Sequence, residues 1–124
     1  MSDFELKVWC LLTQVPRGKV TTYGILAKAA GNERAARAVG SAMRKNPYSP
    51  KVPCHRAILA SGKVGGFQGK ESLESKEVQR KLEMLKEEGV SFKDGKLTKK
   101  QLEKFLFTDF KDPGKVGKEF FEKL

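Results

Sequence analysis

Apolar side chains recur three and four residues apart near the start of the chain, a spacing that predicts two amphipathic helices. The first is expected to begin after Ser2, because a serine followed three residues later by Glu5 forms a capping box, and to end before Pro16. The second is expected over Tyr23–Ala30, with Thr22 as its N-cap. The residues just before Tyr23 favour β structure and predict a short strand there.

A third helix is expected from Asn32, a strong N-cap residue, to Lys45, because Asn46-Pro47 ends it. The face expected to lie on the core carries Ala35, Val39, Ala42 and Met43. The opposite, basic face carries Arg34, Arg37, Ser41 and Arg44, separated only by the small residues Ala36, Ala38 and Gly40. A solvated helix is often basic but has no need to be thin. This slim helix, which follows a short turn with Gly31, predicts a helix-turn-helix that enters a nucleic-acid groove.

Beyond residue 50 the pattern predicts a small β element and further helices. Strands are expected at residues 57–60 and 63–67, followed by a glycine-containing loop, and an outer helix rich in Glu and Lys is expected from Ser72 or Ser75 to Gly89. Two short helices are expected later, the last with Phe120 on its apolar face. We therefore predict a mainly α fold with a small β element, built as a winged-helix-like helix-turn-helix domain. This domain is expected over residues 1–97, with a basic C-terminal extension of short helices or partly disordered chain over residues 98–124.

The formal net charge of +10 is concentrated in the first half of the chain. Residues 1–70 contain twelve Lys and Arg against three Asp and Glu, a net charge of +9. Residues 71–97 carry −1 and residues 98–124 carry +2. A merely soluble Lys-rich surface is more often balanced by acids, as it is after residue 70. The one-sided basic field therefore favours a nucleic-acid partner.

The composition argues against several other classes of protein. No apolar run approaches the roughly twenty residues of a membrane span, and the first residues open directly into a helical pattern rather than a signal peptide. We expect an intracellular protein with no membrane partner, located in the nucleus if its source is eukaryotic and otherwise in the cytoplasm. Cys10, Cys54 and His55 cannot supply the four ligands of a zinc site, so no metal is expected and both thiols are read as reduced. No cofactor is expected either, because the chain contains no phosphate-binding or dinucleotide glycine motif.

The strongest candidate for chemistry is the pair Cys54-His55, because a nearby base and positive charge favour the thiolate form of a cysteine. By itself such a pair is usually incidental. In a straight strand the two side chains would point to opposite faces, so either the backbone turns here or a water molecule links them. Glu88 lies at the unfavourable end of a helix dipole, which is either a tolerated cost or a sign that Glu88 is paired with a functional group.

Five motifs occur in a fixed order along residues 4–90: Gly18-Lys19-Val20-Thr21-Thr22-Tyr23-Gly24, Ala36-Arg37-Ala38-Val39-Gly40-Ser41-Ala42-Met43, Asn46-Pro47, Val52-Pro53-Cys54-His55-Arg56 and Gly65-Gly66-Phe67. Together they resemble the DNA-binding, active-site domain of the methylated-DNA–protein-cysteine methyltransferases, the O6-alkylguanine-DNA alkyltransferases. Alkyltransferase-like proteins are related to this family. They bind alkylated DNA without repairing it and have tryptophan at the position of Cys54.

The resemblance implies a role for each matching residue. Cys54 would accept the alkyl group irreversibly, with His55 as a base acting through water and Glu88 orienting that histidine. Tyr23 would contact the flipped guanine, and Asn46 would brace the active-site turn. Arg37 would fill the gap left by the flipped nucleotide. Further contacts to DNA would come from Thr22, Arg34, Ala36, Ser41 and Arg44, and the substrate pocket would be lined by Met43, Ala57, Phe67 and Gln68.

Three positions depart from the family pattern. Ala57 replaces valine, which should be tolerated because the contact there is expected from its backbone carbonyl. Phe67 replaces a tyrosine common in the family and removes a hydroxyl from the pocket wall. Gln68 replaces a smaller residue whose backbone amide faces the guanine oxygen. Nothing in the chain corresponds to the amino-terminal domain of many members.

We therefore predict a monomeric, single-turnover methylated-DNA–[protein]-cysteine S-methyltransferase that acts on double-stranded DNA containing O6-alkylguanine. It is expected to bind in the minor groove, flip out the damaged base and transfer the alkyl group to Cys54. The first alternative is an alkyltransferase-like protein that recognises the lesion and signals to another repair pathway, but such a binder needs no nucleophile. A helix-turn-helix regulator leaves the motif around Cys54 unexplained. A thiol hydrolase has no use for a groove-binding basic helix.

Overall fold

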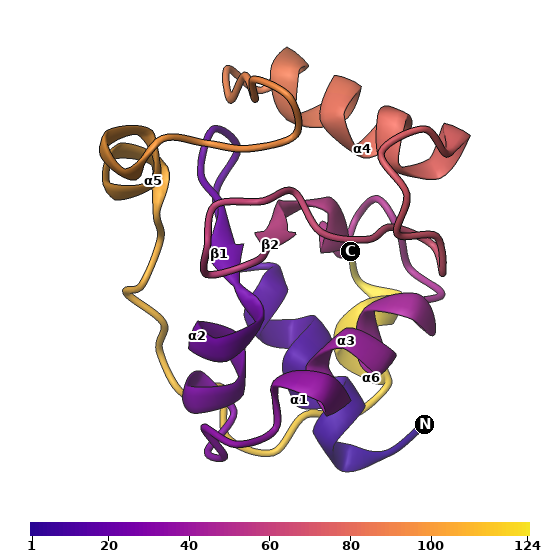
Figure 1. The fold of residues 1–124 in the computed structure, drawn as a ribbon. Helices are drawn as coiled ribbons and strands as arrows, with labels where there is room; N and C mark the ends of the chain where they lie inside the picture. Colours follow the sequence, from indigo (N-terminus) through magenta and orange to yellow (C-terminus); the bar gives the residue numbers. More distant parts are fainter.

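The computed structural model describes residues 1–124 and is mostly helical, with a two-stranded sheet between the helices (Figure 1). The helices α1 (Asp3–Leu12), α2 (Tyr23–Ala29) and α3 (Ala36–Arg44) pack against one another. The predicted fold class, mainly α with a small β element in a helix-turn-helix arrangement, is therefore confirmed. None of the helices combines the length and the apolar character that crossing a bilayer requires.

The first two helices begin where their capping residues predict. The Ser2 hydroxyl accepts a hydrogen bond from the Glu5 backbone N–H at 3.1 Å, and the Ser2 backbone N–H donates to the Glu5 carboxylate at 2.9 Å. The Thr22 hydroxyl accepts from the Ile25 backbone N–H at 3.1 Å. The strand expected just before α2 is β1 (Thr21–Thr22).

The third helix begins three residues later than predicted. The Asn32 side-chain oxygen accepts from the Arg34 backbone N–H at 3.2 Å, so this side chain stabilises a local turn rather than the helix start. Ala35 is the N-cap residue of α3 and makes no side-chain cap hydrogen bond. Arg34 therefore precedes α3 instead of lying on its basic face.

The sheet joins distant parts of the chain. Strand β1 pairs in parallel with β2 (Ala57–Ile58), with Thr21 opposite Ala57. The prediction of a return strand at residues 63–67 was wrong. In this segment Lys63 forms an isolated bridge with Lys96, and Phe67 forms one with Lys70. Two carbonyls of this segment, those of Val64 and Gly66, accept hydrogen bonds from the buried Lys81 of α4 instead of from a neighbouring strand.

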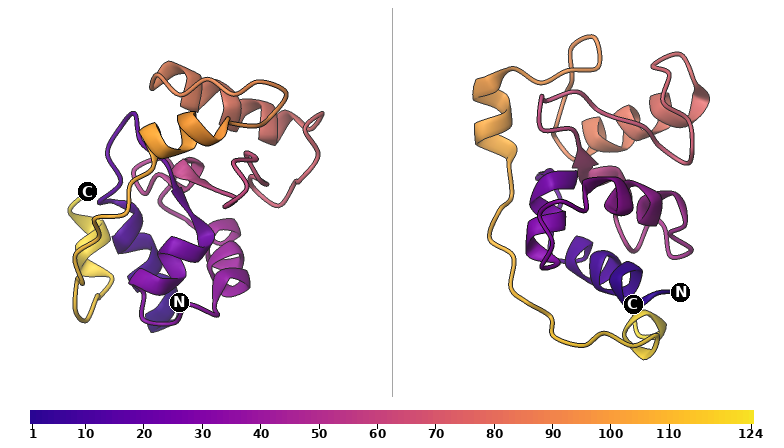
Figure 2. Two further views of the ribbon diagram at one scale, coloured as in Figure 1. Left: turned by 60° about the vertical axis from the view of Figure 1, so that its left-hand side comes forward. Right: turned by 60° about the horizontal axis from the view of Figure 1, so that its bottom comes forward.

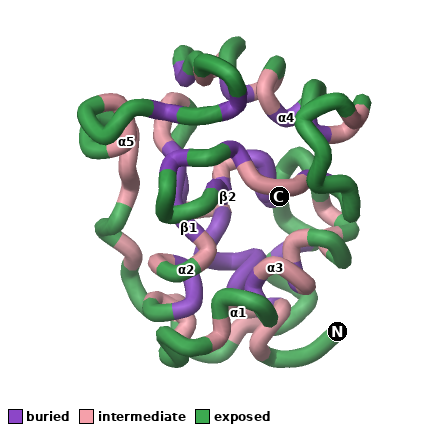
Figure 3. Tube along the Cα trace, in the orientation of Figure 1, coloured by how far each residue is buried: buried purple, intermediate pink, exposed green.

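Helix α4 (Lys76–Glu87) begins after the N-cap Ser75 and packs against a single 3₁₀ turn, η1 (Cys54–Arg56). Buried positions gather around β1, β2 and the inner faces of the helices (Figure 3). The core residues that are less than 2% exposed include Trp9, Leu11, Leu12, Leu26, Val39, Ile58 and Leu85. The turn η1 is thus fixed between the core and α4.

The last part of the chain contains α5 (Lys99–Phe105) and α6 (Glu119–Glu122), which confirms the two short helices expected there. A long extended segment joins them and carries the chain around to α6 beside α1 (Figure 2). The predicted burial in the last helix was wrong by one position: Phe121 is 4% exposed, whereas Phe120 is 38% exposed. A helix of one turn is too short for a spacing pattern to fix its buried face. That residues 98–124 are an extension separate from a domain ending at residue 97 stays a prediction.

Candidate active site

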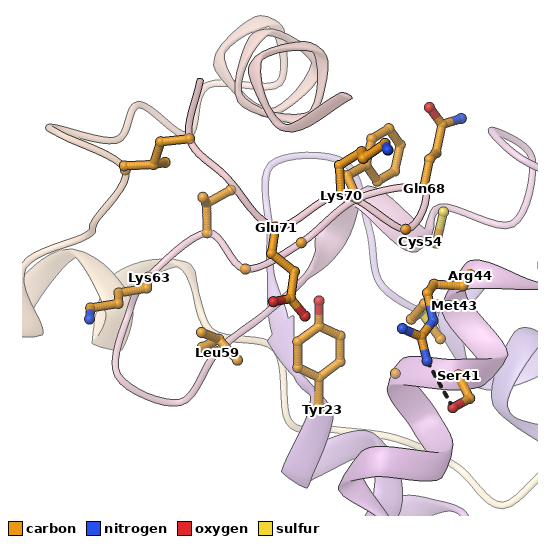
Figure 4. A pocket seen from close by; sticks show the side chains of 18 of the residues that line it. Tyr23, Ser41, Met43, Arg44, Cys54, Leu59, Lys63, Gln68, Lys70 and Glu71 are labelled. Atoms are coloured by element: carbon orange, nitrogen blue, oxygen red, sulfur yellow. Dashed lines mark hydrogen bonds between the residues drawn. The ribbon is translucent and has the colours of Figure 1, made fainter. Parts of the chain in front are cut away.

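A pocket of about 790 Å³ lies between the start of α2, the side of α3 and the loop after β2 (Figure 4). Cys54 lines it, although its side chain is only 6% exposed. The pocket brings together eight of the residues singled out from the sequence: Tyr23, Arg37, Ser41, Met43, Arg44, Cys54, Phe67 and Gln68. Of the predicted substrate-pocket residues, only Ala57 does not line it.

Cys54 begins the turn η1, so of the two alternatives for the Cys54-His55 pair the backbone does turn here. The Arg56 backbone N–H donates to the Pro53 carbonyl at 3.0 Å and closes the turn. The Cys54 Sγ atom lies 3.9 Å from the Ser49 hydroxyl oxygen. A hydroxyl group at this position can donate to a thiolate and stabilise it. Ser49 could not be selected from the sequence, because it is one of several polar residues in an irregular loop.

His55 and Arg56 both contact the Glu88 carboxylate. His55 Nε2 lies 2.9 Å from one carboxylate oxygen, and Arg56 donates to both oxygens at 2.9 Å. Arg56 also donates to the Val15 carbonyl at 2.8 Å, which fixes the guanidinium. Glu88 is the C-cap residue of α4, where a carboxylate opposes the helix dipole. Its pairing with Arg56 and His55 offsets that cost, which answers the question raised by its position in the sequence.

The protonation states of this group suit a general base. Burial acts to raise the pKa of Glu88, but the hydrogen bonds from Arg56 and His55 outweigh it and leave that pKa lowered. Burial lowers the pKa of His55, against the opposing effect of Glu88. His55 is therefore neutral near pH 7, with Nε2–H donating to the ionised Glu88. The other ring nitrogen, Nδ1, is buried without a protein partner and is the one left to accept a proton.

Tyr23 points into the pocket from the first turn of α2 (Figure 4). Burial, followed by the nearby charges of Cys54 and Glu71, raises the pKa of Tyr23 to about 12. Its hydroxyl therefore keeps its proton at neutral pH and is available as a donor. Gly65 makes room for it: a Cβ atom there would lie 3.1 Å from the Tyr23 oxygen, and the backbone φ of +77° also favours glycine.

Lys81 is the largest feature that the sequence reasoning missed. Its ammonium is fully buried and donates to the carbonyls of Ala57 at 2.7 Å, Val64 at 2.7 Å and Gly66 at 3.1 Å. Burial lowers the pKa of Lys81 to about 7, and a negative charge on Cys54 raises it. The three acceptors match the three N–H groups of the charged form. Lys81 therefore ties β2 to the glycine-containing wall of the pocket.

A signal for Lys81 was present in the sequence. Lys81 stands three residues after Val78 and four before Leu85, so it lies on the apolar face of α4 rather than on the solvated one. A charge on an apolar face is rarely buried without partners. Its partners are backbone carbonyls, which no residue pattern reveals.

The remaining predicted residues lie in different surroundings. The Asn46 amide donates to the Val52 carbonyl at 2.9 Å and its oxygen accepts from the Tyr48 backbone N–H at 2.9 Å, so it spans the loop before Cys54. Thr22 is buried, and its hydroxyl is used to cap α2. The Ala57 carbonyl, expected to face the guanine, already accepts from Lys81.

Helix α3 presents its basic side next to the pocket. Arg37 and Arg44 are exposed, and Arg44 donates to the Ser41 hydroxyl at 3.3 Å. Ala36 and Ala38 are also exposed, so the helix is slim where it meets solvent. Arg34 and Ala36 do not line the pocket. No group of three or more His, Cys, Asp or Glu side chains is placed to hold a metal ion. The fold and site together define a helix-turn-helix domain with a cysteine in a pocket beside the basic side of α3.

Residues 3–90 match the family described as 6-O-methylguanine DNA methyltransferase, DNA binding domain, and the chain belongs to this family. It is 45% identical over 82 residues to the methylated-DNA–protein-cysteine methyltransferase of Methanosarcina acetivorans, a match that covers 66% of this chain and 51% of that protein. The chain thus spans about half the length of that curated relative.

Two solved structures of DNA complexes are similar. The S. pombe Atl1 structure, in complex with damaged DNA containing O6-carboxymethylguanine, has a TM-score of 0.72 at 33% identity and is matched over 86% of this chain and 96% of that chain. The Mycobacterium tuberculosis OGT structure in complex with DNA has a TM-score of 0.64 at 40% identity, over 72% of this chain and 50% of that chain.

Proposed function

We propose that this protein repairs duplex DNA by transferring the alkyl group of O6-alkylguanine to Cys54, once per molecule. The observation that carries the proposal is the position of Cys54: it lines a pocket beside the exposed basic face of α3, and the residue after it is held by Glu88. The family membership and the DNA complexes of its structural relatives support the DNA substrate.

The chemistry follows from the residues around the pocket. The protein acts as a monomer and inserts helix α3 into the minor groove of the DNA. Arg37 then takes the place of the flipped nucleotide in the base stack. The Cys54 sulfur attacks the alkyl carbon, so a sulfur–carbon bond forms while the carbon–oxygen bond breaks and its electron pair moves to the guanine oxygen. The thiol proton passes through water to His55 Nδ1, and Tyr23 donates a proton towards the guanine. The product is restored guanine and a permanently alkylated Cys54.

A second candidate is lesion recognition without transfer. One observation favours it. The region similar to this protein is 96% of the S. pombe Atl1 chain, but only 50% of the M. tuberculosis OGT chain. Such a protein would bind O6-alkylguanine DNA and signal to another repair pathway. The cysteine, its hydroxyl neighbour Ser49 and the His55–Glu88 pair argue for transfer, because binding alone needs none of them.

Intact mass spectrometry separates the two candidates. After incubation with a duplex that contains O6-methylguanine, we expect the protein to gain one methyl group, located on Cys54 by peptide mapping. The Cys54→Ser variant should gain nothing, and the matched control Cys10→Ser should gain the methyl group as the parent does, because Cys10 lies on α1 and does not line the pocket. Tight binding of the damaged duplex with no change in mass would support recognition without transfer.

A further inference from the structure

The segment after α5, residues 106–124, runs around the base of the molecule and is held to it by several contacts (Figure 2). We call it the C-terminal strap. It begins with an isolated bridge between Leu106 and Val20, the residue before β1. The Val20 N–H donates to the Phe105 carbonyl at 2.9 Å, and the Phe107 N–H donates to the Val20 carbonyl at 2.7 Å. Further along, Gln14 and Lys111 exchange two hydrogen bonds, of 2.8 and 2.9 Å. The strap is therefore an ordered part of the fold.

The strap ends in an aromatic contact with the active-site loop. Phe121 is 4% exposed and stacks on Tyr48, with ring centroids 4.6 Å apart and an angle of 4° between the rings. It also meets Trp9 edge-on at 6.2 Å. Trp9 donates through its indole N–H to the Ala42 carbonyl of α3 at 2.8 Å. Phe121 is thus seated between the loop that leads to Cys54 and a residue that holds the recognition helix.

The contacts continue from Tyr48 to the reactive sulfur. The Val52 N–H donates to the Tyr48 carbonyl at 3.1 Å, and the Cys54 N–H donates to the Val52 carbonyl at 2.9 Å. Ser49, next to Tyr48, lies 3.9 Å from the Cys54 sulfur. A second contact fastens the same loop, because the Lys51 ammonium donates to the Leu124 backbone oxygen at 3.0 Å. A shift of the Tyr48 ring would therefore move the groups that set the position of Cys54.

We propose that Phe121 is a positioning residue for Cys54, acting through Tyr48 and the loop of residues 46–53. The proposal rests on the transfer function proposed above. Neither Phe121 nor any other residue of the strap lines the pocket, so its effect on transfer is indirect. The strap also lies outside residues 3–90, the part of the chain that matches the family. The family match therefore gives no information on this positioning role, which depends on residues outside the matched region.

The test compares Phe121→Ala with Phe120→Ala, a matched control because Phe120 is the neighbouring ring but is 38% exposed. Two readouts are measured on the full chain. The first is the rate at which iodoacetamide labels Cys54 relative to Cys10, located by peptide mass spectrometry without DNA. The second is the single-turnover transfer rate at a saturating concentration of O6-methylguanine duplex. Phe121→Leu, which keeps most of the buried apolar volume, serves if Phe121→Ala does not fold.

In Phe121→Ala we expect Cys54 labelling to rise several-fold while Cys10 labelling is unchanged, since the loop opens but the core does not. We expect the transfer rate to fall about ten-fold, because a displaced nucleophile loses its alignment with the alkyl carbon. Phe120→Ala should match the parent in both readouts. A ratio of Cys54 to Cys10 labelling that stays constant, or a transfer rate that is unchanged in Phe121→Ala, would overturn the proposal. If the parent protein transfers nothing, the transfer function fails, and the labelling ratio alone decides whether Phe121 positions the loop.

Discussion

At the scale of single residues, Lys81 shows how a buried charge can serve as a structural tie. Its ammonium has no carboxylate partner, and its three hydrogen bonds all end on backbone carbonyls that belong to β2 and the pocket wall. Hydrogen bonds to the neutral carbonyls stabilise the charged form of Lys81, whereas burial lowers its pKa to about 7. The same side chain thus stabilises the wall of the pocket.

We expect Lys81→Met to destabilise the protein by about 2–4 kcal/mol, because three buried carbonyls lose their donor while the apolar stem is retained. Urea unfolding followed by circular dichroism measures this change. Lys86→Met, an exposed position in the last turn of the same helix, should change the free energy of unfolding by less than about 0.5 kcal/mol. Equal losses in the two variants would show that the three hydrogen bonds contribute nothing to stability.

The pair His55–Glu88 predicts a pH dependence of stability. Burial lowers the pKa of His55 below its usual 6.5, so the unfolded chain binds this proton more readily than the folded protein does. Stability should therefore decrease as the pH falls through 6.5 towards the lowered value. Glu88 acts in a different window: its pKa is lowered from 4.5, so the stability it contributes is lost only as the pH falls below 4.5.

Glu88 remains ionised at pH 7.5 and 5.5, but Lys81, with a pKa lowered to about 7, titrates in this range as well as His55. Urea titrations at both pH values therefore compare the parent protein with His55→Gln, because the difference between them is the contribution of His55. The parent protein should be less stable at pH 5.5. In His55→Gln this decrease should be smaller, since glutamine can still donate to Glu88 but does not titrate. A parent protein that is equally stable at both pH values would contradict the neutral state assigned to His55.

At the scale of secondary structure, the sequence predicts elements well where the local signal is chemical. Ser2 and Thr22 each cap a helix where expected, and of the two serines proposed for the start of α4 it is Ser75 that caps it. Asn32 was misleading because the same side chain stabilises a turn as readily as a helix start. The parallel pairing of β1 with β2 could not be predicted, since two-residue strands carry no alternating pattern and their pairing depends on contacts distant in sequence.

The candidate site divides in the same way. Cys54, His55 and Tyr23 lie within motifs of adjacent residues and could be selected from the sequence by resemblance. Glu88 could be selected because it opposes the dipole of its helix. Other residues of the site could not be selected in this way. Lys81 donates to backbone carbonyls, and Ser49 approaches the Cys54 sulfur across a loop. Only the folded chain brings them together.

Helix α3 allows a test of groove insertion with a matched pair of arginines. Arg37 lies on α3 and lines the pocket, whereas Arg34 precedes the helix and does not. Both are exposed cations, so each substitution to alanine should weaken binding of undamaged duplex to a similar, small extent. In addition, Arg37→Ala should slow methyl transfer from duplex DNA by about 10–100-fold, because the gap left by the flipped nucleotide is no longer filled.

Fluorescence anisotropy with undamaged duplex measures the first effect, and rapid quench with O6-methylguanine duplex measures the second. Free O6-methylguanine or O6-benzylguanine provides a control, because no nucleotide has to be flipped and Arg37→Ala should react with it as the parent does. If Arg37→Ala and Arg34→Ala lose transfer equally, Arg37 has no role in flipping.

At the scale of the whole molecule, the distribution of charge predicts which part of the protein contacts DNA in the proposed function. The excess positive charge lies in residues 1–70, which include α3, whereas the strap and α5 belong to a nearly balanced region. The basic side of α3 borders the pocket, so under the proposed function DNA should contact this side, and α5 should contribute little to binding. This separation predicts that removing one charge has different effects in the two regions.

The logarithm of the association constant for undamaged duplex should fall linearly with the logarithm of the salt concentration, because bound counterions are released from the phosphates. Arg44→Gln, on the exposed side of α3, should reduce the slope by about one unit. Lys100→Gln, an exposed position on α5 that does not line the pocket, removes the same charge and should leave the slope unchanged. Both slopes follow from anisotropy titrations between about 50 and 200 mM salt. Equal reductions in the two variants would mean that DNA contacts the protein through its overall charge rather than through α3.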